Sequence, residues 1–353
     1  MSDIRPSTAW PLAAIASAAL FGASTPLAKL LLGAVDPWLL AGLLYLGSGL
    51  GLTAVHLGRR WFGLPAREAP LRRRDLPWLA AVVLAGGAIG PVLLMTGLST
   101  TPASSAALLL NLEGLATMAI AWLVFRENVD RRILLGAGAI LAGAVLLSWQ
   151  GGPAGIGWGA LAIAGACAAW GIDNNLTRGL SAADPVQIAM TKGLAAGSVN
   201  LLLALWHGAA LPSVAVVAEA ALVGFLGYGV SLVLFVLGLR HLGTARTGAY
   251  FSTAPFIGAG LAVVLFGEPV GPRLVVAAVL MGVGLYLHLV ERHEHEHVHE
   301  ELVHEHLHVH DEHHRHEHES GTPHEEPHSH PHRHLPMAHR HPHYPDLHHR
   351  HAH

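Results

Sequence analysis

The first 290 residues contain ten apolar segments, each about as long as a membrane-spanning helix. A bilayer core of about 30 Å needs roughly 20 apolar residues at 1.5 Å rise per residue. Short loops separate the segments, which are almost free of charge, so a soluble protein with ten buried helices is a much weaker interpretation. We expect an all-α membrane protein with ten transmembrane helices near residues 9–32, 37–57, 76–97, 102–125, 131–149, 157–179, 184–206, 216–239, 244–266 and 271–290.

The last part of the chain is of a different kind. Of the 28 histidines, only His56, His207, His241 and His288 precede residue 290. Residues 291–353 also contain many more acidic than basic residues, so the net charge of −3 combines a basic membrane part with an acidic tail. This division excludes a single soluble globular domain, and the one cysteine excludes an intrachain disulfide.

Arginine placement predicts the orientation in the membrane. Cytoplasmic loops are enriched in Lys and Arg, and the arginines here fall almost entirely on one side of the predicted spans. We therefore expect a multi-pass cell (inner) membrane protein whose N-terminus and histidine-rich C-terminus are both cytoplasmic. The arginines of that side are Arg5, Arg59, Arg60, Arg67, Arg72, Arg73, Arg74, Arg126, Arg131, Arg132, Arg178, Arg240 and Arg246.

The two halves of the membrane part resemble each other. Residues 21–29 can be laid on residues 170–178, and the Phe-x-Glu-x-Val segment 125–129 matches 266–270 at an offset of 141. Each half contains five predicted spans. Because five is odd, the second half enters the membrane from the opposite face, which produces inverted repeats. Such repeats are typical of secondary transporters with a site near the bilayer midplane.

These features resemble the EamA type of the drug/metabolite transporter superfamily. The resemblance rests on the five-plus-five arrangement, on the Asp-Pro pairs that open spans two and seven, and on the Phe-x-Glu-x-Val segments that close spans four and nine. It implies five-helix repeats at 9–149 and 155–290, followed by a tail at 291–353, and a transporter rather than an enzyme. The superfamily handles amino acids, sugars, nucleotide derivatives and drugs, so the substrate stays open. The chain departs from the pattern at Glu113-Gly114, where the family often has proline.

Charged residues within the spans mark the candidate site, because a charge at the bilayer centre costs about 2.5–3.5 kcal/mol on insertion scales. The alternative is a buried ion pair between Lys192 and a carboxylate that only sets helix register. On a regular helix Asn111 and Glu113 differ by about 200°, so they cannot both face one cavity unless the helix is locally irregular. The candidate substrate-binding residues are Glu113, Asp173, Lys192, Asn111, Asn174, Asn175 and Asn200.

A second group of residues is predicted to be structural or to act in gating. Glu127 and Glu268 recur in the two repeats near helix ends, and Pro26 and Pro255 lie within spans one and nine. A further hypothesis applies if Glu113 has no charged partner: its carboxylate would then exchange a proton and couple transport to the proton gradient.

The tail alternates histidine with other residues in runs such as His-Glu-His-Glu-His-Val-His. Residues up to about 319 contain neither proline nor glycine and favour a frayed helical extension of span ten, whereas the prolines beyond residue 321 predict disorder. Imidazole suits Zn²⁺, Ni²⁺ and Co²⁺. A metal buffer, a pH-responsive segment and a compositional expansion remain alternatives. The candidate metal ligands are His293, His295, His297, His299, His304, His306, His308 and His310.

The leading hypothesis is a secondary active transporter, an exporter of a small polar or cationic metabolite or drug, with a metal-binding regulatory tail. A divalent transition-metal transporter and a membrane-tethered metal store without transport are the alternatives. The expected partners are the lipid bilayer, the small-molecule substrate and transition-metal ions at the tail, with a homodimer as a possible assembly. We expect no nucleic-acid partner and no required cofactor beyond Zn, Ni or Co on the tail.

Overall fold

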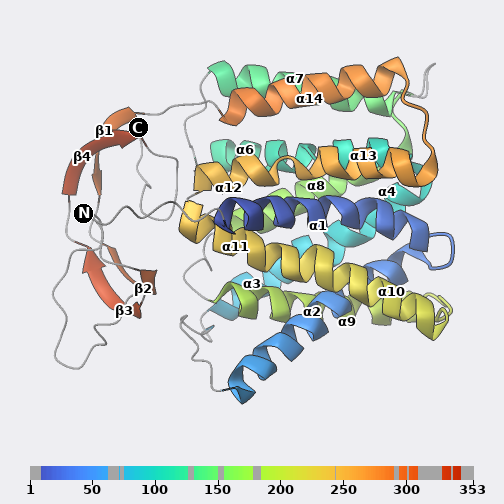
Figure 1. The fold of residues 1–353 in the computed structure, drawn as a ribbon, viewed down its shortest axis with the longest axis horizontal. Helices are drawn as coiled ribbons and strands as arrows, with labels where there is room; N and C mark the ends of the chain where they lie inside the picture. The colour runs from blue at the N-terminus through green and yellow to red at the C-terminus, as the bar shows by residue number, and fades with distance from the viewer. Residues whose placement is uncertain are drawn as a thin grey trace.

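The computed structural model describes residues 9–62, 71, 75–125, 131–149, 155–177, 184–242, 244–289, 294–299, 302–308, 328–334 and 337–342. Figure 1 shows a bundle of helices that run roughly side by side, with short strands beyond one end of the bundle. In chain order the helices are α1 (Ala9–Leu31), α2 (Pro37–Trp61), α3 (Leu76–Val82), the π-helix η2 (Val83–Ile89), α4 (Gly90–Thr100), α5 (Ala103–Leu109), α6 (Leu112–Phe125), α7 (Arg131–Ser148), α8 (Trp158–Thr177), α9 (Pro185–Trp206), α10 (Val214–Gly224), the π-helix η5 (Phe225–Val230), α11 (Ser231–Leu242), α12 (Thr244–Phe251), α13 (Ala254–Phe266) and α14 (Pro272–Leu289).

The helices form the expected membrane spans. Within the part of the chain that the structure describes, nine helical segments are long and apolar enough to cross a bilayer. The sixth expected span is the 20-residue helix α8, which packs against α4 and α6. Its C-terminal part carries Asp173, Asn174 and Asn175, which lower its hydropathy. Asp173 and Asn175 are buried, so α8 keeps most of this polarity inside the bundle. The all-α membrane fold is therefore confirmed.

Local irregularities recur in the two halves and confirm the two-repeat architecture. Span three contains η2 and span eight contains η5, at positions that agree with the offset of 141 to within one residue. Span four is interrupted at Leu110–Asn111 and span nine at Ser252–Thr253, again equivalent to within one residue. Figure 1 shows α1 beginning and α14 ending at the same end of the bundle, as an even number of spans requires.

The Asp-Pro pairs begin two equivalent helices. The Asp36 carboxylate accepts hydrogen bonds from the backbone N–H groups of Trp38 (2.9 Å) and Leu39 (3.2 Å), and Pro37 occupies the first helical position. Asp184 accepts a bond from the N–H of Val186 at 2.9 Å at the start of α9. Side-chain caps satisfy N–H groups that have no partner within the helix and typically stabilise a helix by about 1 kcal/mol.

Glycines allow α2 and α9 to cross closely. A Cβ atom at Gly49 would overlap the backbone of Gly193 and Leu194, and one at Gly197 would overlap Leu46. Small residues at such crossings let backbones approach, and dispersion contacts can then hold helices together where no hydrophobic effect operates between them. This contact joins the second span of one repeat to the second span of the other.

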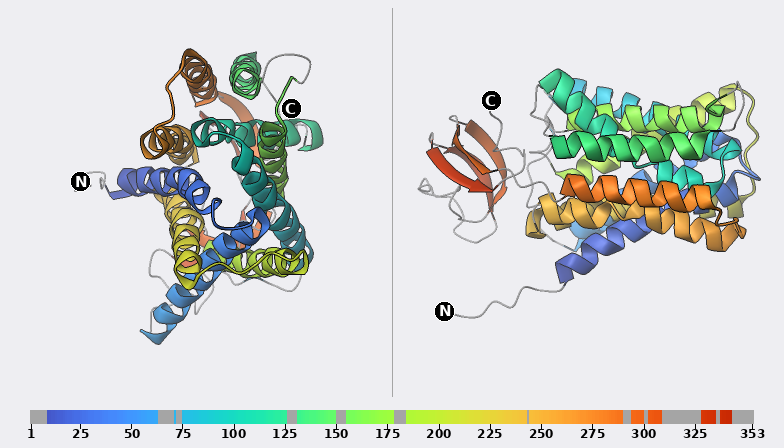
Figure 2. Two further views of the ribbon diagram at one scale, coloured as in Figure 1. Left: turned by 90° about the vertical axis from the view of Figure 1, so that its right-hand side faces the viewer. Right: turned by 90° about the horizontal axis from the view of Figure 1, so that it is seen from above.

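Helices α7 and α14 lie together at one margin of the bundle (Figures 1 and 2). They touch through Gly136 and Gly284, where an added Cβ on either residue would overlap the backbone oxygen of the other. These are the last spans of the two repeats. The charged cluster of Glu113, Asp173 and Lys192 described below lies on other spans.

The tail contains four strands in the described residues. Strand β1 (Glu294–His299) pairs antiparallel with β4 (Met337–Pro342), and β2 (Leu302–His308) pairs antiparallel with β3 (His328–His334). The predicted helical extension is thus wrong for residues 294–299 and 302–308. Strands β3 and β4 lie in the proline-containing part of the tail. Alternation of histidine with a second residue type has the period of a strand rather than of a helix.

The glycine crossing leads to a stability prediction. Gly49→Val should destabilise the purified protein by about 1–3 kcal/mol, the usual effect of overpacking, because α2 and α9 would have to separate. Gly58→Val is the matched control on the same helix, since no described atom lies within 4 Å of a Cβ there. Thermal unfolding in detergent measures both, and an equal effect of the two substitutions would contradict the close crossing.

Candidate functional site

A buried ion pair joins the sixth and seventh spans. Lys192 of α9 donates a hydrogen bond to the Asp173 carboxylate of α8, and their side chains are only 18% and 5% exposed. The Thr177 hydroxyl donates to the same carboxylate at 3.2 Å. Because neither charge has free access to water, each depends on the other for compensation.

Glu113 lies beside this pair, at the interruption of the fourth span. It occupies the first turn of α6, and its carboxylate accepts a hydrogen bond from the Asn174 amide at 3.0 Å. The same amide donates to the Thr117 hydroxyl at 3.1 Å. Asn174 follows Asp173 in α8, so this hydrogen bond joins Glu113 to the helix that carries one partner of the ion pair. Two carboxylates and one ammonium group are therefore gathered from three spans.

The π-helix of span three supplies backbone acceptors at the same place. The Gly86 carbonyl accepts hydrogen bonds from the Tyr45 hydroxyl and the Trp170 indole N–H, both at 2.9 Å. The Gly87 carbonyl accepts one from the Asn200 amide at 3.1 Å. A π-helix shifts hydrogen bonding from i+4 to i+5 and is frequent at functional sites. The Asp173 carboxylate lies so close to Gly86 that a Cβ there would overlap it.

A row of aromatic rings continues from this cluster and contains residues of both repeats. The ring centroids of Tyr45 and Tyr228 are 5.5 Å apart, those of Tyr228 and Phe21 are 6.0 Å apart, and those of Phe21 and Phe251 are 5.2 Å apart. The row joins α2, η5, α1 and α12. Sequence reasoning missed these residues, although Phe21 aligns with Trp170 in the repeat and that alignment was a signal.

The Asp173–Lys192 ion pair has no charged counterpart at the equivalent positions of the first repeat. Asp173 packs on Gly86 of η2, whereas its repeat equivalent Ser24 packs on Gly227 of η5. At the offset of 148 set by the two Asp-Pro pairs, Lys192 corresponds to Leu44. The scaffold is therefore duplicated, but the charges are not.

Two of the predicted residues lie in helix contacts instead of beside Glu113. The helix is indeed irregular at Asn111, yet the buried Asn111 amide donates to the Leu108 carbonyl at 2.8 Å and approaches the Met281 sulfur at 3.8 Å. Asn175 donates to the carbonyls of Thr117 (3.0 Å) and Gly171 (2.8 Å), which joins α8 to α6.

The predicted gating residues fall at helix ends. The Glu268 carboxylate accepts hydrogen bonds from the N–H groups of Ala103 (2.7 Å) and Ser104 (3.0 Å) and from the Ser104 hydroxyl, at the start of α5. Lys29 donates to the carbonyls of Leu98, Ser99 and Thr101, at the end of α4. An anion at a helix N-terminus and a cation at a C-terminus both complement the helix dipole. Pro26 lies inside α1, Pro255 lies at the start of α13, and Glu127 lies outside the described residues.

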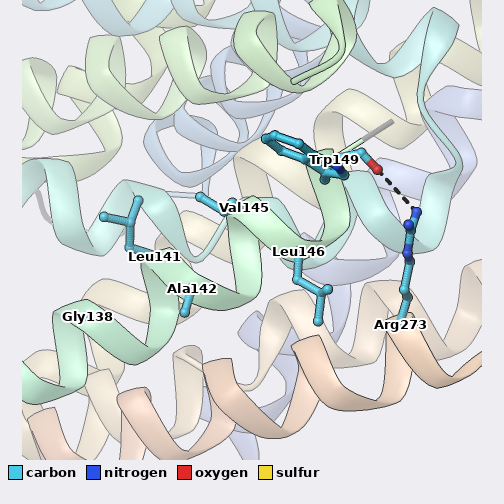
Figure 3. A pocket seen from close by; sticks show the side chains of 7 residues that line it. All are labelled: Gly138, Leu141, Ala142, Val145, Leu146, Trp149 and Arg273. Atoms are coloured by element: carbon cyan, nitrogen blue, oxygen red, sulfur yellow. Dashed lines mark hydrogen bonds between the residues drawn. The ribbon is translucent and has the colours of Figure 1, made fainter. Parts of the chain in front are cut away.

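The surface depressions lie elsewhere. A groove of about 560 Å³ runs along α7, where Arg273 donates a hydrogen bond to the Trp149 carbonyl at 3.1 Å (Figure 3). A second depression of about 410 Å³ involves α2, α9 and α10. Both are lined mainly by apolar side chains, and neither includes Glu113, Asp173 or Lys192.

The two repeats also match a known family. Residues 8–149 and 157–290 each match the EamA-like transporter family. The chain belongs to the EamA-like transporter family. The buried charges, the paired π-helices and the interrupted spans are therefore features of a transporter scaffold with two inverted repeats, embedded in a membrane.

Known relatives within this family are similar over most of the chain. An uncharacterized transporter of Methanothermobacter thermautotrophicus is 28% identical over 294 residues, which cover 79% of this chain and 85% of that protein. A probable terminal-alkyne amino-acid exporter of Streptantibioticus cattleyicolor is 26% identical over 246 residues, covering 68% and 83%. One crystal structure superposes with a TM-score of 0.58 at 21% identity, covering 80% of this chain and 96% of its own, and shows a similar fold.

The ion pair leads to a prediction about stability. Asp173→Asn or Lys192→Met alone should destabilise the protein by about 3–5 kcal/mol, because each leaves one buried charge without its partner. The double variant should lose less than the sum of the two. Unfolding of the wild type, the two single variants and the double variant in detergent measures the coupling energy between the two charges.

Thr177→Val is the matched control for this cycle. It removes one hydrogen bond of Asp173 and leaves the charges paired, so we expect a loss of only about 1 kcal/mol. Additive effects of Asp173→Asn and Lys192→Met would mean that the two charges are not coupled.

Proposed function

We propose that the protein is a secondary active exporter of a small polar or cationic metabolite, working by alternating access. The observation that carries this proposal is the gathering of Glu113, Asp173 and Lys192 at the junction of the two inverted repeats, next to an interrupted span. Interrupted helices near the midplane are the usual place for substrate in such scaffolds. Export as the direction is supported by the relative named as a probable amino-acid exporter.

The charge of the cluster favours a substrate with an ammonium group. The carboxylate of Asp173 is paired with Lys192, whereas the Glu113 carboxylate accepts a hydrogen bond from the neutral Asn174 amide. Glu113 is therefore the carboxylate that is free to bind a cation or to exchange a proton. An exchange of substrate for a proton at this carboxylate would couple export to proton entry.

The helix-end contacts fit a closed gate. Lys29 and Glu268 tie the turn between α4 and α5 to α1 and to the end of α13. This end of the bundle is opposite to the end where α1 begins and α14 ends, which the arginine distribution assigns to the cytoplasm. We therefore assign the Lys29–Glu268 contacts to the non-cytoplasmic gate of an inner-membrane carrier.

The histidine-rich tail then lies in the cytoplasm, where we propose that it binds Zn²⁺, Ni²⁺ or Co²⁺ and regulates the carrier. Deleting residues 293–353 separates this role from that of a metal store, because a transporter keeps its flux without the tail. Uptake into inverted vesicles, measured for a panel of amino acids and for Ni²⁺, Co²⁺ and Zn²⁺, identifies the substrate class.

Glu113→Gln should abolish the pH dependence of transport and weaken the apparent affinity for a cationic substrate. Loss of one hydrogen bond to a charged group is worth about 1.5–3 kcal/mol, so the affinity should fall about tenfold or more. Uptake into inverted vesicles at several pH values, using the substrate found in the panel, measures both.

Glu219→Gln is the matched control, since it makes the same change at an exposed position of α10. It should leave transport unchanged. If Glu113→Gln transports with the wild-type rate and pH profile, Glu113 is neither the substrate ligand nor the proton carrier.

Glu268→Gln should open the non-cytoplasmic gate more often. The test uses a Cys167→Ala background with Asn174→Cys as a reporter beside Glu113. A membrane-impermeant maleimide added from the non-cytoplasmic side labels the cysteine at position 174. Labelling should be about tenfold faster in the Glu268→Gln variant, because its hydrogen bonds to the start of α5 are weaker than those of the charged carboxylate. Glu219→Gln again serves as the control, and equal labelling rates would place the gate elsewhere.

A further inference from the structure

The groove along α7 connects an apolar surface to a single arginine (Figure 3). Gly138, Ala142 and Val145 are exposed, and their helical spacing places them along one face of α7. No described atom lies within 4 Å of a Cβ added at Gly138, so the groove is open above this residue. Arg273 of α14 lies at the other end of the groove, next to Trp149.

The backbone that follows α7 holds Arg273 at this position. The guanidinium donates a hydrogen bond to the Trp149 carbonyl at 3.1 Å. Trp149 pairs with Ile156 in an antiparallel bridge, and the Gly157 N–H donates to the Ser148 carbonyl at 3.2 Å, so the acceptor of the arginine is itself fixed. A guanidinium has several N–H donors in a planar fork. Because Arg273 is exposed, donors that Trp149 does not use can bind an acceptor outside the protein.

The length of the groove matches one leaflet of a bilayer. From Gly138 to Ser148 the helix rises about 15 Å, at 1.5 Å per residue. The hydrocarbon core is about 30 Å thick, so one leaflet contributes about half of it. Tryptophan is enriched where the membrane meets water, and Trp149 directly follows the end of span five. The groove therefore extends from near the midplane to the interface, which places Arg273 at the level of the lipid headgroups.

The lining fits an anionic amphiphile. Apart from Arg273, the described residues that line the groove are apolar, and none of them is acidic. Arginine binds phosphate through paired, charge-assisted hydrogen bonds. The ammonium group of a zwitterionic headgroup would find no carboxylate in this lining. The volume of about 560 Å³ also lies within the range of about 300–1,000 Å³ that is typical of small-molecule sites.

We propose that this groove binds one anionic phospholipid, with an acyl chain along α7 and the phosphate group on Arg273. The bound lipid contacts α7 through its chain and α14 through its headgroup, and so braces the last spans of the two repeats. By the arginine distribution, the groove faces the non-cytoplasmic leaflet. This inference goes beyond the proposed transport function and does not depend on it.

The test is a lipid titration of the purified full chain in detergent, followed by native mass spectrometry. The two probes are phosphatidylglycerol, which is anionic, and phosphatidylethanolamine, which is zwitterionic. The wild type should bind one phosphatidylglycerol about tenfold more tightly than phosphatidylethanolamine, and Arg273→Gln should remove this preference, because it removes the charged donor. Arg59→Gln is the matched control, since it removes an exposed arginine at the opposite end of the bundle and should keep the preference.

Gly138→Leu tests the apolar part of the groove without changing the charge. The added side chain enters open space, so it should not lower the thermal unfolding temperature, and it should weaken phosphatidylglycerol binding several-fold by displacing the acyl chain. Gly260→Leu on α13 is the matched control. No described atom lies within 4 Å of a Cβ there either, and that position is outside the groove.

Three results would overturn the proposal. Equal wild-type affinities for the two lipids, or unchanged phosphatidylglycerol binding by Arg273→Gln, would mean that Arg273 does not hold a phosphate. Unchanged binding by Gly138→Leu would place the acyl chain outside the groove. A wild-type dimer that Gly138→Leu converts to a monomer would mean that a second copy of the chain occupies the groove instead of a lipid.

Discussion

A buried charge inside a membrane needs a partner, and the central part of this structure follows from that constraint. Asp173 and Lys192 pair across α8 and α9 with little access to water. The pair lies against Gly86, where the lack of a side chain gives the carboxylate room beside η2. The ion pair thus brings together spans three, six and seven, and the glycine crossing of α2 with α9 adds span two.

The irregular backbone of the π-helices is the second feature on which the central part of the structure depends. A regular helix uses its own carbonyls, so it has few acceptors to offer to other spans. In η2 the carbonyls of Gly86 and Gly87 accept bonds from side chains of three other spans. The equivalent η5 lies beside Ser24 instead of a carboxylate. The two repeats thus share a similar scaffold, and the Asp173–Lys192 pair occurs at only one of the two equivalent places.

The proposed functions of the two parts of the chain use different chemistry. The membrane part contains a cluster of carboxylates, an ammonium group and backbone carbonyls, whereas the tail is rich in histidine. Their separation agrees with a carrier of an organic solute whose tail responds to a metal. Lys29 and Glu268 lie at the opposite end of the bundle from the tail, so the proposed regulation of a gate there would have to be transmitted through the helices.

The sequence by itself determined the spans, the odd number of spans per repeat and the buried charges, because apolar length and internal repetition are properties of the linear chain. Only the tertiary structure decided which polar groups meet. Asn174 reaches Glu113, while Asn111 turns toward Met281 even though the helix is irregular there. Hydropathy also does not reveal a π-helix or the pairing of distant strands. Those depend on how helices cross and on which segments meet, which no local pattern encodes.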